Sequence, residues 1–251
     1  MPDPNPSSQA EFVAPVPKAV APGALRRWLA AGWRDLAAAP GPSLFYGAVL
    51  AGMGFLLTNW FAGAVGIALT TGFLLVGPFL AIGLYDISRR RELGEPVRLG
   101  PTLIAWKTNF PSIGFYALVL TLLLAVWIRV SVVVVALFFP GGRIDWSSPD
   151  AWAFAAAYAA AGSGLALFVF ATSSLSLPAL LDRRDLDTIT AAIVSFNALR
   201  TNFATMFAWA ACIVLATALG FATGFLGLVV ILPLVGHMTW HAYRESVAPW
   251  G

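Results

Sequence analysis

Residues 112–139 read SIGFYALVLTLLLAVWIRVSVVVVALFF, an apolar run that contains a single charged residue, Arg129. About 20 apolar helical residues suffice to cross a hydrocarbon core about 30 Å thick, so this run is long enough to span a membrane. It lacks the regular alternation of apolar and polar residues that is typical of membrane barrel strands. The stretch therefore predicts an all-α integral membrane protein.

Similar apolar runs lie on both sides of this stretch. The six predicted spans are Ser43 to Trp60, Ala64 to Ile87, Ser112 to Phe139, Ala151 to Leu181, Phe203 to Ala222 and Gly224 to Tyr243. The chain has 251 residues, of which 59% are hydrophobic and 11% are charged, a balance far from that of a soluble domain. Very short turns after the first and fifth runs indicate three antiparallel hairpins. A proline lies in the second member of each hairpin, at Pro78, Pro178 and Pro233.

The Lys and Arg residues indicate the orientation of the spans. Almost all of them lie before the first run, after an even-numbered run or in the tail, whereas Arg143 alone lies in a loop of the opposite side. Cytoplasmic loops carry an excess of basic residues, so we expect a multi-pass protein of the bacterial inner membrane with both termini in the cytoplasm. The chain has a formal net charge of +3, and most of its basic residues lie in short loops beside apolar runs. This placement favours anionic lipid headgroups as partners and not nucleic acid.

Residues 1–22 differ in composition from the rest of the chain. They contain six prolines and no apolar block, which predicts a disordered cytoplasmic tail followed by a six-helix transmembrane domain over residues 23–247. The tail lacks the basic start and apolar segment of a signal peptide. We therefore expect the first span to act as the insertion signal.

A short repeated pattern precedes the hairpins. Trp106-Lys107-Thr108-Asn109-Phe110 comes before the third span, Leu199-Arg200-Thr201-Asn202-Phe203 before the fifth, and Trp33-Arg34-Asp35-Leu36 is a looser version before the first. Each lies within or at the end of a stretch whose apolar residues recur at helical spacing. We therefore predict an amphipathic helix in the cytoplasmic headgroup plane before each hairpin. The alternative is that Trp and Arg were placed at membrane borders independently.

Two groups of polar residues stand out within the spans. Arg129 falls close to the outer boundary of the third span, counting about 1.5 Å per residue from Ser112. We expect it to extend its charge to the interface, the alternative being a partner such as Thr70 or Thr71, or a bound anion. A hydroxyl cluster before Pro178 either satisfies the kinked backbone or lines a solute path. The cluster consists of Thr172, Ser173, Ser174 and Ser176.

Three segments near the C-terminus resemble a bacterial family of predicted polytopic membrane proteins of unknown function. They read SLSLPALLDRRD (174–185), FATGFLGLVVILP (221–233) and LVGHMTWHAYR (234–244), and the likeness covers about residues 25–247. The pair His237 and His241 is its most specific portion, although Met238 stands where a small residue is expected. Some members of this family are labelled cytochrome c oxidase subunit, so the resemblance implies a link to a respiratory complex.

The chain has only His237 and His241, too few to be the haem-copper subunit of an oxidase. Four residues apart, they project from the same side of one helix and could not ligate one haem from opposite faces. Both could reach one copper or zinc ion, but two ligands from one helix do not complete a site. We therefore expect no cofactor, with haem or copper at this pair as the alternative.

The remaining patterns offer little support for catalysis. The sequence has no nucleophile elbow, no phosphate-cradling glycine loop, no His-Glu-x-x-His motif and no paired carboxylates inside a span. We therefore expect a non-enzymatic protein, most simply an accessory or assembly component of a respiratory complex. The alternative is a small-solute or ion transporter or channel, which the kinked hairpins, the hydroxyl cluster and Arg129 would suit.

Overall fold

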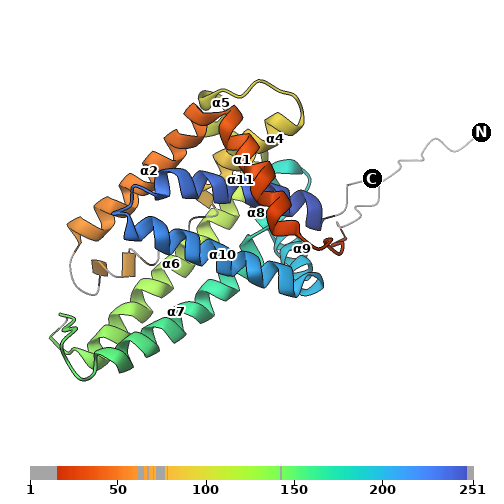
Figure 1. Ribbon diagram of the computed structural model, residues 1–251. Coiled ribbons are helices and arrows are strands. Elements are labelled where there is room, and N and C mark those ends of the chain that lie inside the picture. The colour runs from red at the N-terminus through yellow and green to blue at the C-terminus, as the bar shows by residue number, and fades with distance from the viewer. Residues whose placement is uncertain are drawn as a thin grey trace, which may run out of the picture.

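The computed structural model describes residues 16–61, 65–66, 68–69, 71, 77, 79–141 and 143–247. Within these residues the only β pairing is an isolated bridge between Pro17 and Val247, which confirms the all-α prediction. Figure 1 shows the helices, which are α1 (Ala24–Ala38), α2 (Pro40–Trp60), α4 (Ile82–Glu92), α5 (Leu99–Leu103), the 3-10 helix η1 (Ala105–Asn109), α6 (Phe110–Phe138), α7 (Ala151–Ser173), α8 (Ser176–Asp182), α9 (Thr188–Thr201), α10 (Phe203–Ala222) and α11 (Leu228–Ser246).

Four helical segments among the described residues are long and apolar enough to cross a membrane. They are Pro40–Trp60, Ala105–Phe138, Ala151–Asp182 and Phe203–Ala222, which correspond to the predicted spans one, three, four and five. Nine of the 24 residues of the predicted second span, Pro78 among them, lie outside the described residues, as do residues 1–15 of the tail, and the last six residues of that span belong to α4. The predicted sixth span coincides with α11, which is not among the four. Membrane-spanning helices are thus present, while the count of six stays a prediction.

The backbone breaks in the same way at the start of three of these segments. The residue before each helix lies outside helical geometry, with φ −134° and ψ 57° at Ala39, φ −138° and ψ 61° at Asn109, and φ −120° and ψ 37° at Asn202. These positions separate α1 from α2, η1 from α6 and α9 from α10. The sequence repeat therefore coincides with a repeated joint between a short helix and a span.

The short helices before the spans do not all behave as the repeat predicts. The apolar face of α1, which includes Trp28 and Gly32, packs along α11 and so contacts protein (Figure 1). In α9 the apolar side chains Ile189 and Ile193 are exposed, as an interfacial helix requires. The middle stretch forms α5 and η1 and not one helix, because the backbone leaves helical geometry at Ile104.

The fourth predicted span is interrupted near its proline. The continuous kinked helix over Ala151 to Leu181 is replaced by α7 and α8, which are separated at Ser174 and Leu175. Pro178 lies in the first turn of α8, where its missing N–H leaves no intrahelical bond unmade. All of α8 except its last residue is buried, so this short helix lies inside the bundle.

A close approach of α2 and α11 helps to fix the bundle. A Cβ on Gly47 would lie 1.9 Å from the carbonyl oxygen of Val229 and 2.8 Å from Cγ of Pro233. Only glycine permits this crossing, because any side chain would overlap the α11 backbone. The core beside it includes Trp28 and Trp209, whose rings meet edge to face at 6.0 Å.

Candidate functional site

The two histidines lie on the buried face of α11, one helical turn apart, and bind different helices. His237 is fully buried, with Nε2 3.0 Å from the Ser43 hydroxyl of α2 and Nδ1 2.8 Å from the Ser88 hydroxyl of α4. His241 Nε2 donates to Oδ2 of Asp35 on α1 at 2.8 Å. The histidine pair therefore joins α11 to three other helices.

Asp35 is the charged centre of this arrangement. Its Oδ1 accepts a hydrogen bond from Arg91 at 2.6 Å, and the same guanidinium nitrogen donates to the Arg34 carbonyl. Burial alone would raise the pKa of Asp35, but hydrogen bonds from His241 and Ser88 outweigh it and lower the pKa below the ordinary value of 3.8. Asp35 is therefore a carboxylate at neutral pH, and it is paired with an arginine.

Asp35, Ser43, Ser88, Arg91, His237 and His241 form what we call the histidine network. Each ring nitrogen of His237 faces a serine hydroxyl, Nδ1 that of Ser88 and Nε2 that of Ser43. A hydroxyl can donate and accept, so these contacts accommodate either ring tautomer. Both ring nitrogens of His237 are thus already in hydrogen bonds, and a metal could bind there only by displacing a serine.

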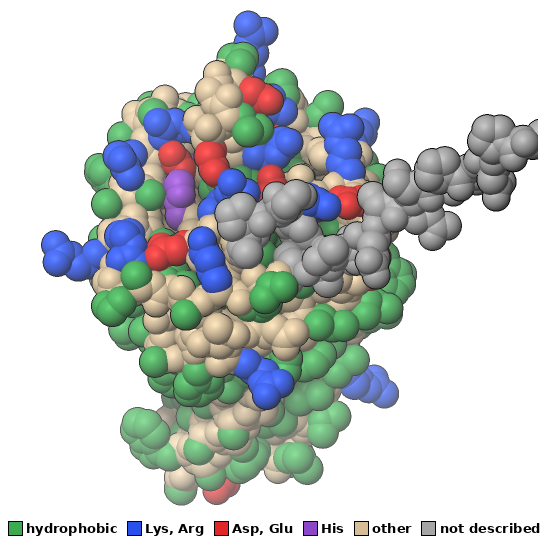
Figure 2. All heavy atoms as spheres, turned by 90° about the vertical axis from the view of Figure 1, so that its right-hand side faces the viewer, with side chains coloured by type: hydrophobic (Ala, Val, Ile, Leu, Met, Phe, Trp, Pro, Cys, Tyr) green, Lys and Arg blue, Asp and Glu red, His purple; other side chains and the backbone are tan. Residues whose placement is uncertain are grey.

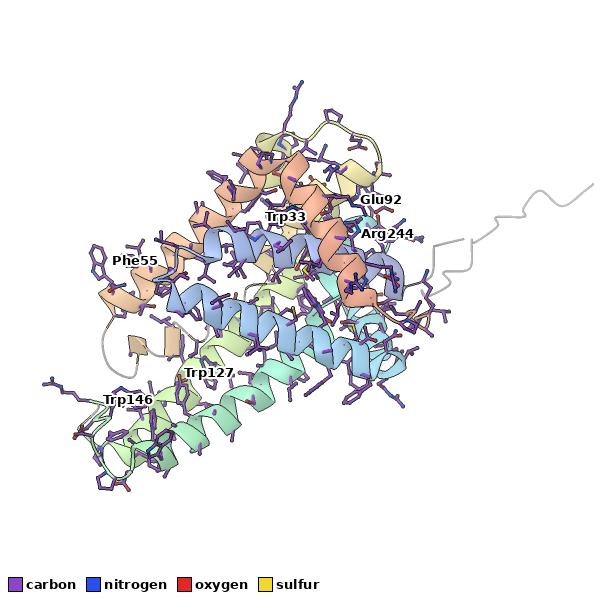
Figure 3. The ribbon with its side chains drawn as sticks, in the orientation of Figure 1. Trp33, Phe55, Glu92, Trp127, Trp146 and Arg244 are labelled. Atoms are coloured by element: carbon purple, nitrogen blue, oxygen red, sulfur yellow. The ribbon has the colours of Figure 1, made fainter. Side chains whose placement is uncertain are left out.

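A layer of ion pairs extends the network toward the end of α11. Asp182 at the end of α8 accepts from the Tyr243 hydroxyl at 2.9 Å and from Arg244 at 3.2 Å, and its carboxylate lies 3.8 Å from Nε of Arg89. Arg244 also pairs with Glu92 of α4 at 2.9 Å, a contact whose two residues are labelled in Figure 3. Ion pairs and a hydrogen bond therefore join the ends of α4, α8 and α11.

Charged side chains gather at one end of the molecule. In Figure 2 most of the Lys, Arg, Asp and Glu side chains on the visible face lie in its upper half, and apolar side chains dominate below. Trp146, in the loop between α6 and α7, lies far from Glu92 and Arg244 in Figure 3. This separation matches a membrane protein with a charged cytoplasmic end.

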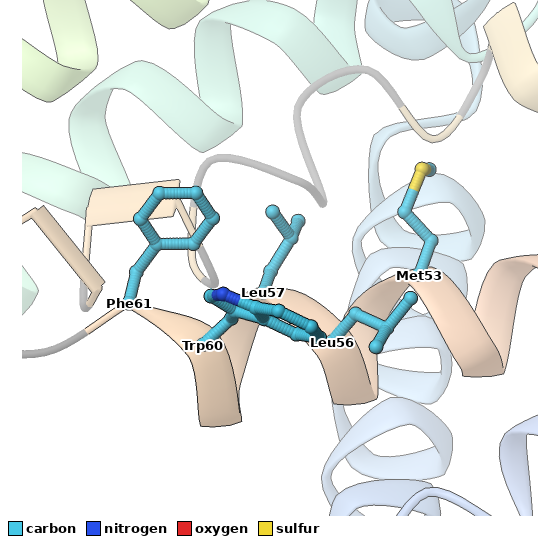
Figure 4. Close-up of a pocket in the computed structure, with 5 residues that line it drawn as sticks. All are labelled: Met53, Leu56, Leu57, Trp60 and Phe61. Carbon is cyan, nitrogen blue, oxygen red and sulfur yellow. The ribbon is translucent and has the colours of Figure 1, made fainter.

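One cleft lies at the C-terminal end of α2. It has a volume of about 380 Å³ and is lined by Met53, Leu56, Leu57, Trp60 and Phe61 (Figure 4). All five side chains are apolar apart from the indole nitrogen of Trp60. The cleft therefore offers no acid, base or nucleophile, and its exposed Trp60 suits a membrane border.

Arg129 lies exposed on α6, and no ion pair or hydrogen bond of its side chain occurs in the part of the chain that the structure describes. Thr71, one predicted partner, instead accepts from the indole nitrogen of Trp127 at 2.9 Å and lies 3.1 Å from the Tyr158 hydroxyl. Thr70 falls outside the described residues. The structure therefore does not bring Arg129 and Thr71 together.

The hydroxyl cluster surrounds the break between α7 and α8. Three of its side chains donate to backbone carbonyls, and the fourth lies 3.3 Å from the hydroxyl of Ser195 on α9. The donors are Thr172 to Phe168, Ser173 to Val169, and Ser176 to both Thr172 and Ala191. Ser174 is the fourth. The bonds of Thr172 and Ser173 run back to carbonyls within α7, and the bond from Ser176 to Thr172 crosses the break. Whether the cluster also borders a solute path stays a prediction.

Most partners of the two histidines carry no local signal in the sequence. Ser43, Ser88 and Arg91 carry no distinctive spacing, so no local pattern could have identified them. Asp35 did offer a signal, because it lies on the same helical face of α1 as Trp28. A carboxylate on an otherwise apolar face indicates a buried partner.

Residues 66–182 match the model of a family described as predicted integral membrane protein (DUF2189), which is of unknown function. This segment is a little under half of the chain and is similar to that family. The matched region contains α4 to α8 and ends before the histidine pair, so the wider resemblance over residues 25–247 stays a prediction. Searches of curated proteins and of solved structures give no match to this chain.

Proposed function

We propose that this protein is a non-catalytic accessory or assembly component that packs against a larger complex in the bacterial inner membrane. The observation that carries the proposal is an exposed face of α7 on which Ala156, Ala160 and Gly164 recur at every fourth residue. A Cβ on Gly164 would meet no atom within 4 Å. Small residues at this spacing permit close packing of another helix, whereas contact with lipid does not require them.

A respiratory complex is the partner that we propose. Support comes from the oxidase label that some members of the resembling family carry, since this chain has too few histidines to hold the haems itself. The polar groups of the histidine network are directed at one another, which suits a structural role better than a catalytic one. The protein would then be needed to build or stabilise the complex and not for its electron transfer.

We also propose that the chain spans the membrane six times with both termini in the cytoplasm. The basic residues Arg89, Arg90 and Arg91 end α4, and Arg244 lies in the last turn of α11. The ion pairs around Asp182 join these two helix ends, so both lie at the same end of the bundle. A charged end of this kind belongs in the cytoplasm by the basic-residue rule.

Affinity purification in mild detergent, followed by mass spectrometry, tests the accessory function. We expect subunits of a membrane complex to co-purify with the wild-type protein and to be lost with Ala160→Leu, which places a bulky side chain on the exposed face of α7. Ala218→Leu is the matched control, since Ala218 is an exposed alanine on α10. Equal recovery of the complex with both variants would contradict the proposed surface, and recovery of no complex by the wild type would contradict the function.

A second candidate, a small-solute or ion transporter, is favoured by a polar chain between α6 and α7. Tyr158 links the hydroxyls of Thr71 and Ser131 at 3.1 Å each, and Trp127 donates to Thr71. Flux into proteoliposomes distinguishes the two functions. The accessory protein would show no flux, and Arg129→Lys would leave its amount in the membrane unchanged. Flux that is lost in this lysine variant would favour the transporter, because lysine lacks the planar donor fork of arginine.

A further inference from the structure

A second cleft among the described residues lies beside the start of α6 and is lined by cations from three different segments. Its volume is about 320 Å³. Arg90 comes from α4, Lys107 from η1 and Arg184 from the turn after α8, and Thr108 adds a hydroxyl. We call this site the basic cleft.

Two of the three charges in the basic cleft are not neutralised by the protein. Arg90 is paired with Asp86 at 2.6 Å and with Glu95 at 3.3 Å. In contrast, among the described residues no carboxylate lies within ion-pairing distance of Lys107 or Arg184. An anion entering the cleft would therefore meet a net positive charge at close range.

The fold holds these cations in place. Asn109, at the joint between η1 and α6, donates to the carbonyl oxygens of Arg183 at 3.1 Å and Leu186 at 2.9 Å. These two bonds fasten the turn that carries Arg184 against η1. The amino group of Lys107 lies 5.5 Å from the ring centre of Trp106. The backbone segments that carry Lys107 and Arg184 are thus held side by side.

The position of the basic cleft identifies the kind of anion. Residue Ala105, in the cleft wall, begins one of the four candidate membrane segments. The large apolar side chains Leu103, Ile104 and Phe110 are exposed around it. Apolar side chains with a cationic border are typical of protein surfaces at the depth of lipid headgroups. The ligand must therefore combine a negative charge with an apolar body.

We propose that the basic cleft binds the phosphate of an anionic phospholipid, with Lys107 and Arg184 contacting its oxygens and the acyl chains lying over the exposed apolar side chains. A bound lipid would fix η1 and the turn after α8 relative to the bilayer. The inference rests on the protein being embedded in a membrane and is independent of the proposed accessory role.

The test measures binding of dioctanoyl phosphatidylglycerol to the detergent-purified full chain by thermophoresis. A basic residue near a lipid surface contributes about 1 kcal/mol, so Lys107→Gln and Arg184→Gln should each weaken binding about fivefold, and the double variant about 25-fold. Arg26→Gln, which removes an exposed cation on α1 outside the cleft, is the matched control and should bind like wild type. Melting temperatures should not change, because Lys107 and Arg184 are exposed.

Two comparison ligands identify the source of the phosphate. Dioctanoyl phosphatidylcholine, whose headgroup carries no net charge, should bind with an affinity at least about tenfold lower. Inorganic phosphate should not displace phosphatidylglycerol at equal concentration. Wild-type affinity in the double variant would overturn the proposal, as would an equal loss of affinity with Arg26→Gln. Displacement by inorganic phosphate would show that the cleft takes a free anion and not a lipid.

Discussion

Nε2–H of His241 donates a hydrogen bond to Oδ2 of Asp35 at 2.8 Å and thereby joins α11 to α1, two helices that are 206 residues apart at this contact. The same two helices also meet where Trp28 donates to Glu245 at 2.8 Å. The bridge between Pro17 and Val247 lies just beyond them. These polar bonds therefore add to the apolar packing of α1 along α11 and help to close the bundle.

Removal of the charge on Asp35 should destabilise the protein. Asp35→Asn keeps the shape of the side chain but leaves the partly exposed guanidinium of Arg91 without its carboxylate, for an expected loss of about 1–3 kcal/mol in the free energy of unfolding. Thermal or denaturant unfolding in detergent measures the loss. Asp185→Asn is the control, because Asp185 forms an exposed pair with Arg183. A similar stability of both variants would show that the network around Asp35 is not stabilising.

The same carboxylate should make the protein sensitive to acid. The pKa of Asp35 is lowered in the folded state, so the unfolded chain binds its proton more tightly. Its stabilisation is complete above the ordinary value of 3.8 and is lost as the pH falls through the lower folded value. Melting temperatures measured between about pH 3 and pH 6 should drop at the acid end, and less steeply in Asp35→Asn. Identical pH profiles would contradict a lowered pKa for Asp35.

Most helices were predictable because their signals are local. The apolar run around Arg129 is one long helix, and the predicted joints before α6 and α10 lie at Asn109 and Asn202 as the repeated Thr-Asn-Phe pattern indicates. The interruption of span four at Ser174 and Leu175 also fits the sequence, because Pro178 has no N–H to donate to the carbonyl oxygen of Ser174 four residues earlier.

The candidate site was only partly predictable, because most of its contacts join residues that are far apart in the sequence. Spacing placed His237 and His241 on one face of a helix, and that is where they lie. Their partners Ser43, Ser88 and Asp35 come from three other helices, and such long-range pairings leave little trace in one sequence. Nor did the sequence reveal the basic cleft, which depends on the two bonds of Asn109 to a turn more than 70 residues away.

The crossing of α2 and α11 predicts an effect of a single methyl group. Gly47→Ala places a Cβ 1.9 Å from the Val229 carbonyl oxygen, so the helices must separate, at an expected loss of about 1–3 kcal/mol. Gly52→Ala in the same helix meets no atom within 4 Å and should leave the unfolding temperature unchanged or slightly higher. Equal tolerance of both changes in a detergent unfolding assay would mean that α2 and α11 do not cross this closely.

The purified protein should contain neither haem nor stoichiometric copper or zinc. Both nitrogens of His237 are hydrogen-bonded to serines, and His241 donates to Asp35, so a metal would have to displace these bonds. Absorption in the Soret region and metal analysis measure the content, and His241→Ala should alter neither. One equivalent of metal that disappears in this variant would instead favour a redox role.

The proposed topology places the charged end of the bundle in the cytoplasm. It places the loop between α6 and α7 on the opposite side of the membrane. Alkaline phosphatase, which is active outside the cytoplasm, and a fluorescent protein, which matures inside it, can each be fused after Arg143 or at the C-terminus. We predict phosphatase activity at the first site and fluorescence at the second. The same reporter active at both sites would contradict the predicted topology.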